Sequence, residues 1–216
     1  MRRCMLLLLW ALLVLYPNPY SLYVSAQRAW SPPIDTSAVA ELARKLPNDP
    51  GAIEAAVRTR IVAYAVPWET YALPWYFPSV GEVLAQGQGD CEAQAIVFAS
   101  ILRAKGIPAR IVGSFDHMWV EYPRKRPNAA ENAAVAIATQ RPDGSYQFHW
   151  PKLVDWQKSW AIERAYFWDP MPTGRRWLLG AGWLVIALWG RAKRWRLGWR
   201  WPELGRSHRQ TGPAGK

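Results

Sequence analysis

Residues 83–122 read VLAQGQGDCEAQAIVFASILRAKGIPARIVGSFDHMWVEY, and this segment carries the strongest fold signal in the chain. It contains Cys91, one of two cysteines, and His117, one of three histidines. Residues 93–105 have the apolar spacing of an amphipathic helix, which the following Gly-Ile-Pro sequence ends. Since Asp90 is a good N-cap residue, we predict that Cys91 lies in the first turn of that helix.

A cysteine at a helix start favours nucleophilic chemistry. The free N–H groups and the positive end of the macrodipole stabilise an anion there, so we expect the thiol to lose its proton more readily. A nearby imidazole would complete an ion pair and protonate the leaving group. The strand-like run HMWVEY begins with His117 and places Trp119 and Glu121 on the same face. Residue type alone would instead favour a buried, inert cysteine and a structural histidine.

Three segments in this order, GDCEAQA, LRAKGIPARIVG and HMWVEY, resemble the transglutaminase-like superfamily of papain-fold thiol enzymes, in a membrane-anchored bacterial-type form. The resemblance implies an α+β fold with a papain-like core, in which the nucleophile helix packs on an antiparallel sheet. It also implies that Cys91 is the nucleophile and that His117 is the general base and acid.

The third catalytic residue departs from the family pattern, in which an Asp follows on the strand after the histidine. If the chain turns in the basic run after HMWVEY, antiparallel pairing brings Glu131 or Asn132 opposite His117. A carboxylate or amide there would hold the imidazole in the productive tautomer. We select Glu131, with Asn132 as the second choice and Asp155 as the third.

An oxyanion hole needs two donors, and the glycines before Cys91 allow the backbone to approach a substrate closely. The Cys91 backbone N–H is one candidate. The side chain of Gln86 or Gln88 is the other, and a solvated glutamine fits the sequence equally well. No Cys, His and Asp cluster has metal-ligand spacing, so we expect no metal and no cofactor.

The rest of the domain, predicted over residues 27–170, has helical patterns before this segment and strand patterns after it. An irregular linker is expected over residues 27–33. Helices are expected over residues 35–46, 50–65, 78–85 and 153–166. Strands are expected over residues 110–113, 117–122, 131–139 and 146–150, which would form one antiparallel sheet. Arg58, Arg60 and the basic run 124–126 are interpreted as solvated.

The N-terminus begins with two arginines and an apolar run over residues 4–16, the layout of a secretory signal. The run is shorter than the roughly 20 residues that a spanning helix needs. Val24-Ser25-Ala26 is a plausible cleavage site. We therefore interpret residues 1–26 as a signal peptide or an uncleaved membrane anchor, and the sequence leaves both open.

The C-terminus combines an apolar run with a basic tail, residues 192–216, which holds most of the chain's net charge of +11. We interpret residues 175–191 as a transmembrane helix, with Trp177 and Trp189 at the two interfaces; a buried or interfacial helix is the alternative. The positive-inside rule places the tail in the cytoplasm and the Cys91 domain on the extracytoplasmic side. Beside an apolar helix, lipid head groups are a simpler partner for the tail than nucleic acid.

These features predict a membrane-associated thiol enzyme that cleaves or transfers amide (peptide) acyl groups through a Cys91 thioester, with His117 as acid and base. It would be a cysteine peptidase or amidase, or an acyltransferase, acting on a peptide or protein substrate. The departure at the third residue motivates an alternative, a non-catalytic scaffold or binding module in the cell envelope. The sequence leaves the acyl donor, the acceptor and the oligomeric state open.

Overall fold

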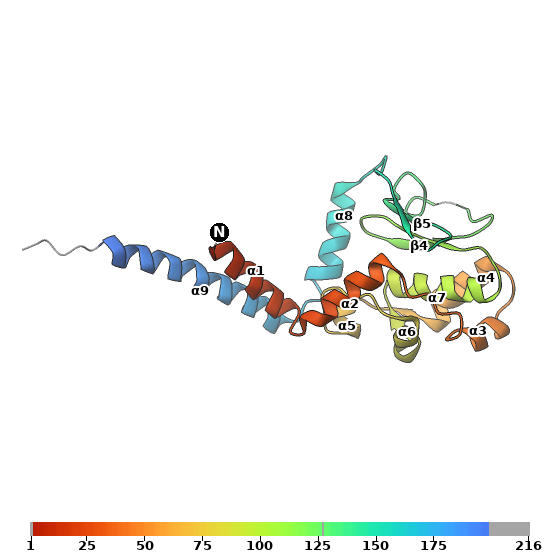
Figure 1. The fold of residues 1–216 in the computed structure, drawn as a ribbon, viewed down its shortest axis with the longest axis horizontal. Helices are drawn as coiled ribbons and strands as arrows, with labels where there is room; N and C mark the ends of the chain where they lie inside the picture. Colours follow the sequence, from red (N-terminus) through yellow and green to blue (C-terminus); the bar gives the residue numbers. More distant parts are fainter. Residues whose placement is uncertain (1, 127, 199–216) are drawn as a thin grey trace, which may run out of the picture.

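The computed structural model describes residues 2–126 and 128–198, with only the backbone over residues 189–198. It shows a folded domain from which the helices α1 and α9 extend together to one side (Figure 1). Most of the tail predicted over residues 192–216 lies outside the described residues.

The helices are short except for the nucleophile helix and the helices towards the two ends of the chain. They are α1 (Arg2–Leu15), α2 (Pro19–Trp30), α3 (Ala40–Lys45), α4 (Pro50–Ala56), the π-helix η1 (Val57–Ile61), α5 (Pro67–Thr70), α6 (Val80–Gln86), α7 (Cys91–Ala104), α8 (Trp156–Glu163), the π-helix η2 (Arg164–Trp168) and α9 (Thr173–Gly198). The strands are β1 (Ala63–Tyr64), β2 (Gln88–Gly89), β3 (Arg110–Gly113), β4 (Met118–Glu121), β5 (Ala138–Gln140) and β6 (Tyr146–Phe148).

Helix α7 is the centre of the core, and its predicted start and cap are confirmed. Asp90 accepts a hydrogen bond from the Ala93 backbone N–H at 3.0 Å, so the helix begins at Cys91. The residues of α7 from Ala95 to Leu102 are all buried. They pack against β3 and β4, and Figure 1 shows the sheet lying over this helix. The nucleophile candidate thus lies at the start of a helix that is largely buried in the core.

The predicted four-stranded antiparallel sheet is confirmed, but its strand order differs from simple succession. The order is β4-β3-β5-β6, so β5 pairs with β3 and β4 is an edge strand. Only the last two residues of the strand predicted over residues 131–139 lie in β5 (Ala138–Gln140), because the first part forms turns and irregular backbone. The residues after the turn therefore do not pair with β4 as the sequence argument assumed.

The predicted helix over residues 50–65 is interrupted. Asp49 caps it by accepting from the Ala52 N–H at 2.9 Å, as expected, but the α-helix ends at Ala56. The π-helix η1 follows, and the chain then forms β1, which pairs in parallel with β2 just before Cys91.

Helices α1 and α9 lie against each other, and α2 connects α1 to the domain. The predicted linker over residues 27–33 is largely helical, because α2 continues to Trp30. Among the described residues, no single helix is long and apolar enough to cross a membrane; α1 and α2, bent by 85° at their junction, reach that length and composition only as a pair.

The close approach of β2 to α7 gives a test of the packing at the helix start. A Cβ added at Gly89 would lie 2.4 Å from the Cβ of Ala93, whereas one added at Gly81 in α6 meets nothing within 4 Å. We expect Gly89→Ala to lower the free energy of unfolding by about 1–3 kcal/mol, since Ala93 is rigid.

Gly81→Ala is the matched control, and we expect it to raise the free energy of unfolding by up to ~1 kcal/mol through helix propensity. Urea unfolding followed by tryptophan fluorescence measures both variants. Equal effects of the two substitutions would contradict the packing described at Gly89.

Candidate active site

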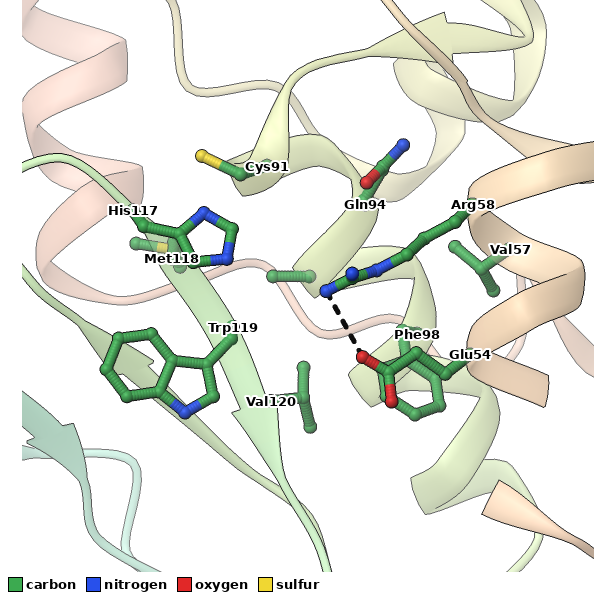
Figure 2. Close-up of a pocket in the computed structure, with 11 residues that line it drawn as sticks. Glu54, Val57, Arg58, Cys91, Gln94, Phe98, His117, Met118, Trp119 and Val120 are labelled. Carbon is green, nitrogen blue, oxygen red and sulfur yellow. Dashed lines mark ion pairs between the residues drawn. The ribbon is translucent and has the colours of Figure 1, made fainter. Parts of the chain in front are cut away.

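Cys91 and His117 line one small cavity between α7, η1 and β4 (Figure 2). They also line a wider adjoining groove with a volume of about 460 Å³. Aromatic side chains form much of the groove wall: Tyr64, Trp75, Phe115, Tyr166 and Phe167. The two residues singled out in the sequence therefore face the same space, and that space has room for a peptide-sized group.

The His117 ring is oriented by a carboxylate. Its Nε2 lies 3.0 Å from Oε1 of Glu131, the first choice for the third residue. Glu131 is ionised and can only accept, so Nε2 carries the hydrogen and the neutral ring has its lone pair on Nδ1. Figure 2 shows Nδ1 on the side of the ring that faces Cys91. The lone pair that could accept a proton is therefore on the same side of the ring as the thiol.

The other two choices for the third residue lie elsewhere. Asn132 donates through Nδ2 to the Asn128 carbonyl at 2.8 Å, within its own loop. Asp155 is exposed and caps α8 by accepting from the Lys158 N–H at 3.0 Å. The structure brings neither of them to His117.

Glu131 reaches His117 by a route that the sequence argument did not foresee. It lies in a turn whose Asn128 side chain accepts from the Glu131 N–H at 2.9 Å. The predicted pairing of its strand with β4 does not occur, because β5 pairs with β3. The residue is the one selected, but a side-chain-capped turn places it, and strand register does not.

Two basic residues hold Glu131, and both were interpreted as solvated. Lys125 Nζ lies 2.9 Å from Oε2, and Arg58 Nη2 donates to Oε1 at 2.7 Å. The Lys125 side chain is only 6 % exposed, so this part of the predicted solvated run 124–126 is buried. The hydrogen bond from His117, followed by those from Lys125 and Arg58, holds the pKa of Glu131 well below its usual range despite burial.

The turn before β4 fixes the backbone of His117. The Ser114 hydroxyl accepts from the His117 N–H at 3.1 Å and donates to Asp116 at 3.0 Å. The His117 ring also stacks on the buried Trp119 at 6.1 Å between centroids. The imidazole is thereby held by its backbone, its face and its Nε2 edge.

The electrostatics of Cys91 contradict the expected low pKa. Burial raises the pKa of the thiol to about 12, and the charges of Asp90 and Glu92 add to the effect. The Met118 and Glu92 backbone N–H groups act in the opposite direction but do not outweigh burial. The thiol is therefore protonated at neutral pH, and the thiolate can form only as a base removes its proton.

Both carboxyl groups beside Cys91 are buried, and aromatic donors that the sequence did not single out bind them. Both oxygens of Glu92 accept from Trp75 Nε1 at 3.1 Å, and the Tyr166 hydroxyl donates to Asp90. Burial raises the pKa of Glu92 to about 8, and it also raises that of Asp90. Glu92 is thus largely uncharged at neutral pH.

The side chains predicted for the oxyanion hole are not in the cavity. Gln86 is exposed at the end of α6, and Gln88 lies in β2; neither lines the spaces that Cys91 lines. Gln94, one turn into α7, lines both and donates through Nε2 to the Val62 carbonyl at 3.0 Å (Figure 2). Helical spacing from Cys91 would have been the signal for this residue.

The buried carboxyl of Glu92 predicts a pH dependence. An unfolded Glu titrates near ~4.3, so between that pH and about 8 the folded chain binds the additional proton. The contribution of Glu92 to the free energy of unfolding therefore falls as pH rises through this window. We expect Glu92→Gln to flatten the slope and the exposed control Glu69→Gln to retain it. Urea unfolding across the window measures this, and an unchanged slope in Glu92→Gln would refute the assignment.

The ion pair beneath His117 gives a second prediction. Lys125→Met keeps the apolar stem but removes the charge that bonds Glu131, and we expect a loss of about 1.5–3 kcal/mol in the free energy of unfolding. The neighbouring exposed Arg126 supplies the control, and Arg126→Met should change it by less than about 0.5 kcal/mol. Urea unfolding compares the two, and similar losses would show that Lys125 does not bear on Glu131.

Comparison with known proteins agrees with this geometry. Searches of curated proteins and of solved structures gave no match. Within the described residues, no group of three or more His, Cys, Asp or Glu side chains is placed to hold a metal ion. The model of the transglutaminase-like superfamily matches residues 40–177, well over half of the chain and the region that contains Cys91, His117 and Glu131. The chain belongs to the transglutaminase-like superfamily.

Proposed function

We propose that this protein is a membrane-associated thiol enzyme that cleaves or transfers amide (peptide) acyl groups. The observation that carries the proposal is the alignment of three side chains. Glu131 holds Nε2 of His117, and Nδ1 lies on the side of Cys91 in a shared cavity. A histidine placed only for structure would not need a buried carboxylate behind it and a thiol in front of it.

The chemistry follows from the protonation states. The Cys91 sulfur attacks the amide carbonyl while His117 Nδ1 accepts the thiol proton, because a thiol with a pKa of about 12 gives no resting thiolate. The tetrahedral intermediate collapses as His117 returns that proton to the leaving amine, and a thioester remains. Water then gives hydrolysis, and an amine gives transamidation. Glu131 stabilises the imidazolium formed between the two steps.

The Cys91 backbone N–H is our candidate for one oxyanion donor. It lies in the open first turn of α7, where N–H groups have no partner within the helix. The aromatic groove beside it favours a peptide or protein substrate, since such walls bind apolar and amide surfaces of a chain.

We place the enzyme at a membrane, with the Cys91 domain on the extracytoplasmic side and the C-terminal tail in the cytoplasm. Support comes from the exposed apolar side chains of α1 and α9 and from the arginines and lysines at the ends of these helices that lie away from the domain. The protein would then be a membrane-anchored, bacterial-type member of the family, as its sequence suggests.

A non-catalytic scaffold or binding module of the cell envelope is the second candidate. One observation favours it: burial, followed by the charge of Asp90, raises the pKa of Cys91 and keeps the thiol protonated. A binding module would use the same aromatic groove without forming a thioester.

Acylation by p-nitrophenyl acetate separates the two candidates. The acetyl group forms a thioester with the Cys91 sulfur, the ester C–O bond breaks, and p-nitrophenol leaves with the thiol proton transferred through His117. We expect His117→Ala to slow acetylation of Cys91 about 10²–10⁴-fold. Mass spectrometry of the purified full chain measures the acetylated fraction with time.

The exposed His149 provides the matched control, so His149→Ala should acetylate Cys91 at the wild-type rate. If Cys91 reacts at the same rate in wild type and in His117→Ala, the imidazole does not act on the thiol and the scaffold interpretation holds.

A further inference from the structure

We propose that the N-terminal segment is not a removable signal but the second helix of the membrane anchor, paired with α9. The inference rests on the proposed membrane attachment and decides between the two interpretations that the sequence left open for residues 1–26. Four observations carry it: the burial of this segment in the domain, its contacts across the cleavage site, the seating of α1 on α9, and the apolar faces of both helices.

The segment is built into the catalytic domain. The Tyr16 hydroxyl donates to the Trp75 carbonyl at 3.1 Å, and Tyr16 is only 7 % exposed. Ser25 is fully buried, and its hydroxyl accepts from the Phe77 N–H at 3.1 Å. A signal sequence that is removed before folding has no reason to satisfy backbone groups of the mature domain.

Cleavage after Ala26 would cut inside α2 (Pro19–Trp30). It would separate Ser25 from Arg28, although both bind the same loop: Arg28 Nη1 donates to the Phe77 carbonyl at 3.2 Å and pairs with Glu82 at 2.6 Å. The buried Phe77 N–H would lose its partner, which is a costly loss for a backbone donor. Residues on both sides of the suggested cleavage site therefore bind the folded domain.

Side chains of α1 contact the backbone of α9 directly. The Trp10 indole lies over Gly182, where an added Cβ would come 2.0 Å from Nε1, and Nε1 donates to the Leu178 carbonyl at 2.9 Å. One turn nearer the domain, Arg175 donates to the Leu15 carbonyl at 3.1 Å. The later residue of α1, Leu15, contacts the earlier residue of α9, Arg175, so the two helices are antiparallel. Figure 1 shows them side by side.

The faces that this pair leaves uncovered are apolar. The exposed large side chains are Met5, Leu6, Leu8, Leu9 and Leu13 on α1 and Trp177, Leu178, Trp183, Leu184, Val185 and Leu188 on α9. An exposed apolar surface of this extent marks an interaction site.

Charge identifies the occupant of these faces as a lipid bilayer. Because the helices are antiparallel, the start of α1 with Arg2 and Arg3 and the C-terminal part of α9 with Arg191 and Lys193 lie at the same end, away from the domain. This is the distribution that the positive-inside rule gives to a hairpin with both termini in the cytoplasm. Helix α1 is about 21 Å long, so the bilayer must thin or the arginines must extend to its surface.

The two cysteines make retention directly measurable. In a Cys91→Ala chain the remaining thiol is Cys4, which cleavage after Ala26 would remove. We expect the full-length chain from isolated membranes, denatured in detergent, to react with a fluorescent maleimide and to have the intact mass. An unlabelled chain whose mass corresponds to a start at Gln27 would overturn the proposal. The thiol probe reports only on the segment, so its outcome is independent of whether the enzyme is active.

Carbonate extraction tests the bilayer as the partner. We expect the chain to stay in the membrane pellet. Release as a soluble monomer, or as a soluble dimer that covers these faces with a second copy, would overturn insertion even if Cys4 is retained.

Two glycines of α9 test the pairing itself. An added Cβ at Gly182 meets Trp10, whereas one at the exposed Gly180 meets nothing within 4 Å. We expect Gly182→Leu to lower the Tm of the full chain in detergent micelles by several degrees, and Gly180→Leu to leave it unchanged or raise it slightly through helix propensity. Equal shifts for the two variants would refute the seating of α1 on α9.

Discussion

The buried carboxylate of Glu131 connects the stability of this fold to the chemistry of its site. An ionised carboxylate that is only 4 % exposed is tolerated when its oxygens are hydrogen-bonded and its charge is neutralised. Three segments meet that requirement here: η1 brings Arg58, the turn before β4 brings His117, and the loop after β4 brings Lys125. The segments with His117 and Lys125 flank β4, but η1 lies far from them in the sequence. Local structure alone cannot bring Arg58 to this site, so the complete set of contacts forms only when the domain folds.

The same carboxylate determines which ring nitrogen of His117 can act. Because Glu131 accepts from Nε2, the lone pair of the neutral ring is on Nδ1, the side of Cys91. The thiol has a raised pKa, so this tautomer matters more than it would beside a preformed thiolate. Activation of the Cys91 thiol would therefore depend on His117 and Glu131 and not on the helix dipole.

The sequence was sufficient for features that depend on local spacing. The cap at Asp90, the helix from Cys91 and the antiparallel strands all follow from short-range patterns, and the structure contains them. The sequence was insufficient for properties that depend on burial or on contacts between distant segments. The raised pKa of Cys91 depends on the groups that cover it, and the burial of Lys125 depends on a partner outside its own run.

Glu131 reaches the predicted position beside His117 by a route other than the predicted one. The selection assumed that a strand after the turn would pair with β4, but β5 pairs with β3 and the carboxylate arrives from a capped turn. The short separation in sequence between β4 and Glu131 was informative, because a chain that turns back soon after β4 passes near His117. The side chains of Gln86 and Gln88 lacked such a constraint, and the cavity instead contains Gln94 from the helix itself.

Contacts also connect the helical pair to the groups beside the nucleophile. Tyr16, directly after α1, binds the Trp75 carbonyl, and the Trp75 indole binds Glu92. On the other side, η2 precedes α9, and its Tyr166 binds Asp90. The carboxyl groups on both sides of Cys91 are therefore bound by residues that join the domain to its two outer helices.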